Sequence, residues 1–277
     1  LAALFGGCIG AFSKIALQTI PPVLLTFLRF FLGSIIITPF LVKEGKMTKP
    51  SVRVVLLSFI MVLNTIAYSF GIRLTTATIG QILFSAVPIL TALASFLFIK
   101  ERIGLRKIIG VSIGFLGTVF IILLPVIGKH TAFNGNLLGN MLVFISAICL
   151  AWYSVLSKKF HTHYSPLYLT ALFIYLTALT NGLLAIPELL ANYNFLNTIP
   201  FLGWIGVLYV GTFGILFFLL YQYAVKHGSP IIASTLNYLS PVVAFVVASI
   251  LLGERLTGGF IAGALLALLG VYIVTVG

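Results

Sequence analysis

The chain has 277 residues, of which 61% are hydrophobic and only 7% are charged. A soluble domain carries roughly a quarter of charged residues, and its core could not take up this much apolar surface. The composition therefore excludes a soluble globular protein and predicts an all-α membrane protein whose solvent is the lipid bilayer. The net charge of +12 is spread between apolar runs rather than gathered in one patch, so we expect no nucleic-acid partner.

Ten apolar runs follow one another along the chain. Each is long and continuous enough for a transmembrane helix of about 20 residues, and too long for a barrel strand. Proline and glycine mark several of the joints between runs, at Pro21-Pro22, Pro125 and Gly228-Ser229-Pro230. The predicted spans cover residues 1–19, 22–42, 53–72, 76–99, 107–125, 137–157, 166–187, 200–225, 229–252 and 257–276.

Basic residues predict the orientation of these spans. If the N-terminus is cytoplasmic, the inner loops hold eleven Lys and Arg and the outer loops hold three, while Lys14 and Arg29 lie within spans. The side that is richer in Lys and Arg faces the cytoplasm. We therefore expect ten spans with both termini cytoplasmic, in the cell (inner) membrane.

The two halves of the chain repeat each other. A shift of 153 residues pairs Tyr68 with Tyr221 and Pro88 with Pro241, and nearer the N-terminus a shift of 144 pairs Pro22 with Pro166. Each half contains five spans, an odd number, so the two halves must cross the membrane in opposite directions. Inverted repeats of this kind are typical of secondary transporters.

Two stretches carry a family resemblance. They run from Pro88 to Glu101 and from Pro241 to Glu254, each with a proline thirteen residues before a glutamate and a glycine-rich helix after it. With Phe27-Leu-Arg29-Phe30 on the second span, they resemble the EamA branch of the drug/metabolite transporter superfamily. The resemblance implies ten transmembrane helices in two inverted five-helix EamA repeats, the first over residues 1–125 and the second over residues 137–277.

The resemblance also implies a function. It is export or facilitated movement of small organic metabolites, such as amino acids or related compounds, by alternating access. A membrane channel is the alternative, which slow saturable flux would separate from a transporter. A membrane-embedded enzyme needs a nucleophile, an acid/base pair or a metal in the membrane, but the chain has no Asp and no His or Glu in a span core. We therefore expect no enzyme, no metal and no cofactor.

The two prolines near the middle of spans four and nine indicate a site. Proline removes one helical hydrogen bond, and in lipid the freed carbonyl must find a partner or face a water-filled cavity. Pro88 and Pro241 are thus candidate hinges beside a substrate cavity between the repeats. Alternatively, the kinks only fit helices together, and the nearby polar groups bond between helices. The polar candidates on the adjacent turns are Gln81, Ser85, Asn237 and Tyr238.

Other spans supply amide side chains and aromatic rings with polar groups, and such rings suit a partly apolar metabolite. An interfacial or lipid-facing role is the alternative for the aromatic ones. These candidates are Asn64, Tyr68, Trp152, Tyr221 and Gln222.

The remaining charged residues have more than one interpretation. Arg29 is either an anion site for a substrate carboxylate or phosphate, or a side chain that snorkels to the outer interface. For Lys14 we favour snorkelling or hydrogen bonding to helix-end carbonyls. We expect Glu101 to be structural, at a helix start or paired with Arg102 or Arg106. All four histidines are expected in loops, exposed to water.

Glycine spacing predicts close helix packing. Gly110-x-x-x-Gly114 lets two helices approach, either within one protomer or between protomers of a homo-oligomer. The expected partners are thus a small-molecule substrate, the lipid bilayer and, if the glycines face outward, a second copy of the chain.

Overall fold

A computed structural model of the chain describes residues 2–45, 49–75, 77–127, 136–191, 199–252 and 258–276, and all the elements in these ranges are helices. The first half contains α1 (Ala2–Gly7), α2 (Ile9–Ala16), α3 (Pro22–Glu44), α4 (Val52–Leu74), α5 (Ala77–Ser85), α6 (Val87–Ile99) and α7 (Leu105–Ile127). The second half contains α8 (Leu137–Phe160), α9 (Pro166–Ala191), α11 (Phe201–His227), α12 (Pro230–Ser234), α13 (Leu236–Leu252) and α14 (Gly258–Val276).

Three of the predicted spans are broken helices. The chain turns at Cys8 between α1 and α2, at Ala86 between α5 and α6, and at Thr235 between α12 and α13. When each broken pair is counted as one pass, the described residues form ten helical passes. Seven helical segments among them are long and apolar enough to cross a membrane by themselves. The predicted all-helical membrane fold is confirmed.

Local sequence signals set the helix ends. Ser51 accepts a hydrogen bond from the backbone N–H of Val54 at 3.4 Å, and Asn136 accepts one from Leu138 at 2.9 Å. Each cap satisfies a backbone donor that has no partner inside its helix. At the C-terminal end of α3, Gly45 takes a positive φ of 67°, a conformation that costs glycine little because it lacks a Cβ.

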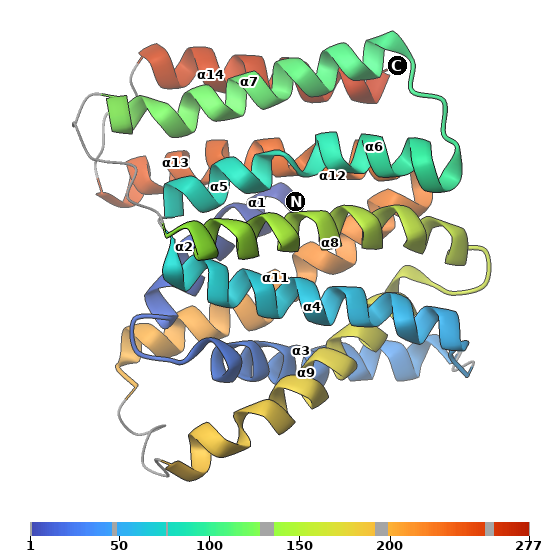
Figure 1. Ribbon diagram of the computed structural model, residues 1–277, viewed down its shortest axis with the longest axis vertical. Helices are drawn as coiled ribbons and strands as arrows, with labels where there is room; N and C mark the ends of the chain where they lie inside the picture. The colour runs from blue at the N-terminus through green and yellow to red at the C-terminus, as the bar shows by residue number, and fades with distance from the viewer. Residues whose placement is uncertain are drawn as a thin grey trace.

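The helices lie side by side in an arrangement with approximate two-fold symmetry (Figure 1). α7 packs along α14 at one end of the long axis, and α3 packs along α9 at the other. The other extensive contacts between the halves occur in equivalent pairs. α4 packs on α8 as α11 packs on α2, α6 packs on α8 as α13 packs on α1, and α3 packs on α11 as α9 packs on α4. Inverted five-helix repeats produce this pattern, since the partner of each contact lies in the opposite half.

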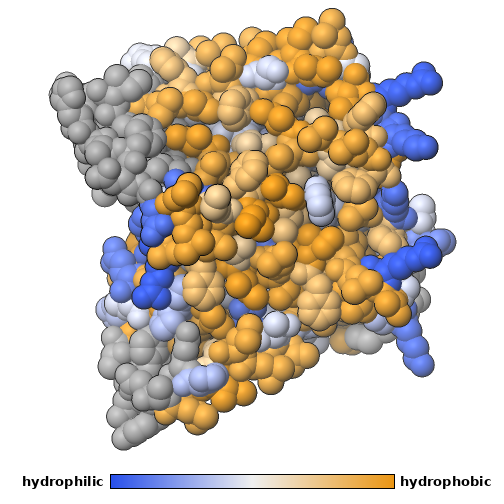
Figure 2. All heavy atoms as spheres, viewed as in Figure 1, coloured by the Kyte–Doolittle hydropathy of each residue, from blue (hydrophilic) through white to orange (hydrophobic). Residues whose placement is uncertain are grey.

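The outer surface fits a lipid solvent. Figure 2 shows a broad hydrophobic band across the molecule, with hydrophilic side chains gathered along its two edges, where the helices end. Large apolar side chains such as Phe40, Leu93 and Phe201 are more than half exposed on this surface. Soluble monomers rarely expose contiguous apolar patches larger than a few hundred Å². The chain is therefore an integral membrane protein.

Glycines let α7 and α14 approach closely within one chain. A Cβ added at Gly117 would lie 2.8 Å from the carbonyl oxygen of Gly263, and one at Gly270 would lie 2.6 Å from that of Gly110. Gly114 instead lies under the ring of Tyr238 from α13. These glycines serve packing inside the protomer, and a homo-oligomer stays a prediction.

Candidate functional site

A cavity of about 120 Å³ lies between the two halves, where the broken helices meet. Seven passes contribute to its wall, so neither half forms it alone. α4 lines it from Asn64 to Ile72, and the cavity borders the breaks in all three interrupted passes. The lining residues are Gly6, Gly7, Ile9, Gly10, Arg29, Asn64, Thr65, Tyr68, Ile72, Gly80, Phe84, Ser85, Leu150, Phe217, Phe218, Asn237, Ser240 and Pro241.

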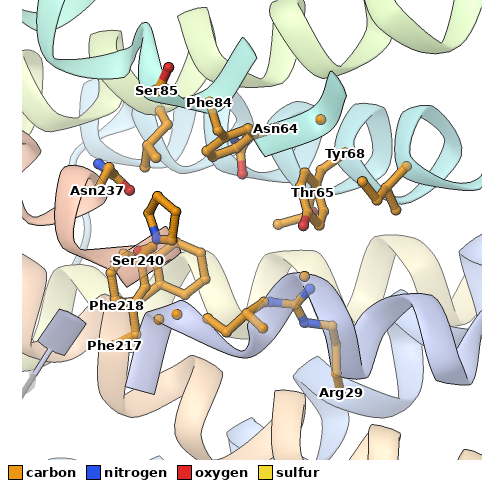
Figure 3. A pocket seen from close by; sticks show the side chains of 18 residues that line it. Arg29, Asn64, Thr65, Tyr68, Phe84, Ser85, Phe217, Phe218, Asn237 and Ser240 are labelled. Carbon is orange, nitrogen blue, oxygen red and sulfur yellow. The ribbon is translucent and has the colours of Figure 1, made fainter. Parts of the chain in front are cut away.

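Six of the predicted residues line this cavity. They come from three consecutive helices of the first half and from α13 of the second half, and Figure 3 shows Arg29 on one side of the pocket with Asn64, Phe84 and Tyr68 across from it. The structure brings these six together: Arg29, Asn64, Tyr68, Ser85, Asn237 and Pro241. Whether they bind a substrate stays a prediction.

Four other predicted residues lie elsewhere. Trp152 is 44% exposed on the outer surface, with its ring edge-on to that of Phe98. Tyr221 is buried and donates to Ser154 Oγ at 3.2 Å. Gln222 accepts from Ser157 Oγ at 3.2 Å. Tyr238 reaches α7, where its hydroxyl donates to the carbonyl of Val111 at 2.9 Å. The side chain of Gln81 lies outside the described residues.

The prolines relate differently to the two helix breaks. Pro88 follows the Ala86 break directly and is the second residue of α6, buried but away from the cavity wall. Pro241 lies inside α13, six residues after the Thr235 break, and lines the cavity. A hinge role for either proline stays a prediction.

Several wall residues were missing from the predicted set. Gly6, Gly7 and Gly10 bring the backbone of the first pass close to the cavity, and a cluster of glycines in one apolar span was the signal available for them. Phe217 and Phe218 supply aromatic walls from α11. Nothing in the apolar sequence of that span separates rings that face a cavity from rings that face lipid.

Most polar groups of the wall already have partners in the protein. Asn64 Nδ2 donates to the carbonyl of Ser146 at 2.7 Å and to its hydroxyl at 2.9 Å. Asn237 Nδ2 donates to the carbonyl of Ser234 at 2.9 Å. The hydroxyls of Thr65 and Ser85 donate to carbonyls within their own helices, at 2.9 and 2.6 Å. Of these four side chains, Asn237 alone keeps a second amide N–H for a ligand, and the donors of the other three are used within the protein.

Arg29 differs from the rest of the wall. It is 4% exposed and lies seven residues into α3, about 10 Å from the start of that helix. Its guanidinium lies over the Phe30 ring, 4.8 Å from the centroid. Among the described residues its Nε has no hydrogen-bond partner. Arg29 also takes part in no ion pair among these residues, since the ion pair they contain joins Lys107 to Glu101 at 2.9 Å. A buried charge without a partner costs several kcal/mol.

Three other sequence predictions have outcomes here. Lys14 donates to the carbonyl of Thr75 at 3.1 Å, a helix-end contact of the kind we favoured. Glu101 pairs with Lys107 rather than with Arg102 or Arg106. The prediction of solvated histidines is wrong for His161, which is buried because α8 packs its last turn against α11.

Hydrogen bonding and burial define the state of His161. Its Nε2 lies 3.0 Å from Gln222 Oε1. Burial lowers the pKa of His161 from 6.5 to about 4, although the hydrogen bond from His161 to Gln222 partly opposes this. The ring is therefore neutral near pH 7. The described residues contain no group of three or more His, Cys, Asp or Glu that could hold a metal ion.

Comparison with known proteins identifies related sequences. The profile of the EamA-like transporter family matches residues 1–123 and 137–276. An uncharacterized transporter of Archaeoglobus fulgidus is 31% identical over 204 residues, which cover 71% of this chain and 67% of that protein.

Two relatives carry names that state a substrate. A probable amino-acid metabolite efflux pump of Salmonella typhimurium is 27% identical, over 94% of this chain and 87% of its own length. An S-adenosylmethionine uptake transporter of Rickettsia bellii is 25% identical, over 82% and 75%. A solved crystal structure of a protein at 20% identity superimposes with a TM-score of 0.75 over 99% of this chain and 97% of its own, which shows a shared fold.

Proposed function

The chain belongs to the EamA-like transporter family, and on that premise we propose that it moves small organic metabolites across the membrane by alternating access. One observation carries the proposal: a cavity with polar and aromatic walls lies between two inverted halves, beside the breaks in their helices. Binding sites of inverted-repeat transporters lie at this kind of position.

The cavity is asymmetric, which supports an alternating mechanism. It extends along Tyr68, Ile72 and Gly80, toward the end of α4 and the start of α5. A shift of 153 residues leads to the equivalent positions in the other half, Tyr221, Val225 and Ala233, which are buried in the packed core. If the two halves exchange these arrangements, the cavity moves to the opposite side of the site.

The distribution of basic residues supports an assignment of the two ends of the cavity to the two sides of the membrane. The predicted topology places both termini in the cytoplasm, so the end of α4 faces the outside. In this orientation the structure is a state whose cavity lies toward the outer side, with the cytoplasmic side packed shut. The names of these two relatives support a small organic substrate but differ in direction, one being uptake and the other efflux.

Reconstitution in liposomes tests the proposal. A panel of labelled amino acids and small organic acids should include a substrate with saturable uptake that is accelerated by the same unlabelled solute inside the vesicles. Asn237→Leu should slow this flux because it replaces a polar cavity wall, whereas Leu63→Ala on the lipid-facing side of α4 should not. Ion conductance without saturation would favour a channel, and a panel without flux or thermal stabilisation would refute the proposal.

A further inference from the structure

We infer that Arg29 and the hydroxyl of Tyr68 bind the carboxylate of the transported solute, so that the substrate class is a small monocarboxylate with an apolar tail. The inference rests on the proposed transport function and names the chemistry of its site. It is carried by one unpartnered buried cation in the wall of the cavity.

The largest group of free donors in the cavity wall belongs to one side chain, although the Ser240 hydroxyl also lines the cavity. The amides and hydroxyls of Asn64, Thr65, Ser85 and Asn237 donate to protein oxygens. Arg29 keeps its guanidinium donors, since the described part of the chain provides no hydrogen bond or ion pair for them. The guanidinium geometry matches the two oxygens of a carboxylate.

Tyr68 supplies a second donor close to the same point. Its hydroxyl lies opposite Gly10, 3.5 Å from the position that a Cβ there would take, so this face of α2 offers it no side-chain partner. The ring is held edge-on against Phe84 at 5.3 Å between centroids. Figure 3 shows Tyr68 across the pocket from Arg29, and both residues line the same cavity.

The second half of the molecule provides an internal comparison. The residue equivalent to Arg29, 144 positions later, is Phe173, whose ring packs against those of Phe30 and Phe218 in the core. Tyr221, the equivalent of Tyr68, donates to Ser154, which stands where the first half has Gly10. The second half thus fills and satisfies this corner, whereas the first half leaves a cation and a hydroxyl facing the cavity.

The electrostatics of the cavity favour a solute that carries a single negative charge. No carboxylate belongs to the cavity wall as described, so Arg29 gives the site one uncompensated positive charge. A monocarboxylate neutralises it, whereas a phosphate dianion would leave a net negative charge buried in the membrane, at a cost of several kcal/mol. Apolar side chains of the wall, among them Ile9, Phe217 and Phe218, are available for the tail.

A matched ligand set tests the inference. The probes are 3-methylbutanoate, 3-methylbutanamide and 3-methylbutylamine, which share a carbon skeleton and differ in charge. Binding is measured by calorimetry and thermal stabilisation of the purified full chain. We expect the acid to bind about tenfold to a hundredfold more tightly than the amide, and the amine to bind no better than the amide.

Variants assign this preference to residues. Arg29→Gln should remove the preference for the acid, Arg29→Lys should restore part of it, and Tyr68→Phe should weaken acid binding severalfold. Tyr272→Phe is the matched control, because its side chain is 59% exposed on the outer surface and is not part of the cavity wall, and its affinity for the acid should equal that of the wild type. If Arg29→Gln does not fold, the comparison of acid and amide on the wild type decides the question.

The outcomes separate this inference from the proposed function. Equal affinity for acid and amide, or an unchanged preference in folded Arg29→Gln, overturns the carboxylate site. Saturable flux of a neutral solute in the same liposomes would then leave the transport function standing. Absence of flux for every charged and neutral solute would instead refute the transport function itself.

Discussion

Lys14 and Lys158 occupy equivalent positions, 144 residues apart, and each donates to the backbone at the end of the third pass of its own half. Lys14 Nζ lies 3.1 Å from the carbonyl oxygen of Thr75. Lys158 Nζ lies 2.7 Å from the carbonyl oxygen of Gly228, which is the equivalent of Thr75 at a shift of 153 residues. Lys158 also donates to the carbonyls of Val225 and Lys226, both at 2.9 Å. Cations stabilise helix C-termini, where carbonyls have no intrahelical partner. The end of α11, which lies in the packed core, receives three such bonds. The end of α4, beside the cavity, receives one.

This asymmetry predicts unequal effects of removing the two ammonium groups. Lys158→Met should destabilise the protein by about 2 kcal/mol, because three carbonyls lose a charged donor at once. Lys14→Met should cost about half as much or less, since one longer bond is lost. Unfolding midpoints in detergent measure both changes. Equal midpoints for the two variants would contradict the conclusion that Lys158 stabilises the end of α11 more than Lys14 stabilises the end of α4.

The predicted topology can be checked with described surface residues. Arg73 follows the outer part of α4, and Arg106 lies at the start of α7 on the expected cytoplasmic side. Single cysteines at these positions, with Cys8 and Cys149 replaced by serine, should react with an impermeant thiol reagent from opposite sides of the membrane. Reaction from the same side would contradict the number of passes between them.

The close contact of α7 and α14 predicts a large effect from a single methyl group. Gly270→Ala would place a Cβ 2.6 Å from the carbonyl oxygen of Gly110 and close to the Gly114 backbone, so the helices must separate. We expect a loss of about 1–3 kcal/mol, the range for overpacking. Gly104→Ala is the control, because nothing lies within 4 Å of its added methyl. Thermal melting compares the two, and a Gly270→Ala midpoint as high as the control would contradict the packing.

His161 predicts how stability depends on pH. Its pKa is about 4 in the folded protein, mainly because of burial, and ordinarily about 6.5. Between these values the unfolded chain binds a proton that the folded chain does not, so stability falls as the pH drops from 6.5 toward 4. The expected loss is on the order of 1 kcal/mol after allowance for partial screening.

Two variants isolate this contribution. His161→Asn should flatten the decline in melting temperature over that pH range, whereas His163→Asn, on the exposed turn beside it, should leave the decline unchanged. If the slope of the His161 variant matches that of the wild type, another group is responsible for the decline.

The sequence predicted the passes and singled out six residues that line the cavity, for a physical reason. Charge and amide groups are costly in lipid, so Arg29, Asn64 and Asn237 stood out in apolar runs before their surroundings were known. Aromatic residues carry no such signal: a ring is stable against lipid or protein. Trp152 therefore looked like a cavity residue although it lies on the outer surface, and Phe217 was missed although it lines the wall.

Burial of His161 also depended on information that the sequence does not contain. The residue directly follows α8 and reads as part of a polar loop. Its burial comes from Gln222, 61 residues away, which the packing of α8 against α11 brings within hydrogen-bonding distance. Long-range contacts of this kind require the fold.

The last prediction concerns energy coupling. Proton-driven transporters usually carry an Asp, Glu or His inside the bundle whose pKa changes between access states. The described wall of this cavity contains Arg29, which does not release its proton, and no acid or histidine. We therefore expect solute to move down its own gradient with little dependence on a pH gradient. In liposomes, an imposed pH gradient should leave the final internal concentration of the solute at equilibrium with the outside. Weak acids also accumulate by diffusion of their neutral form, so protein-free liposomes are the control. Protein-dependent accumulation above equilibrium would overturn the expectation, and Glu101→Gln and Glu254→Gln would then show whether either acid couples the proton.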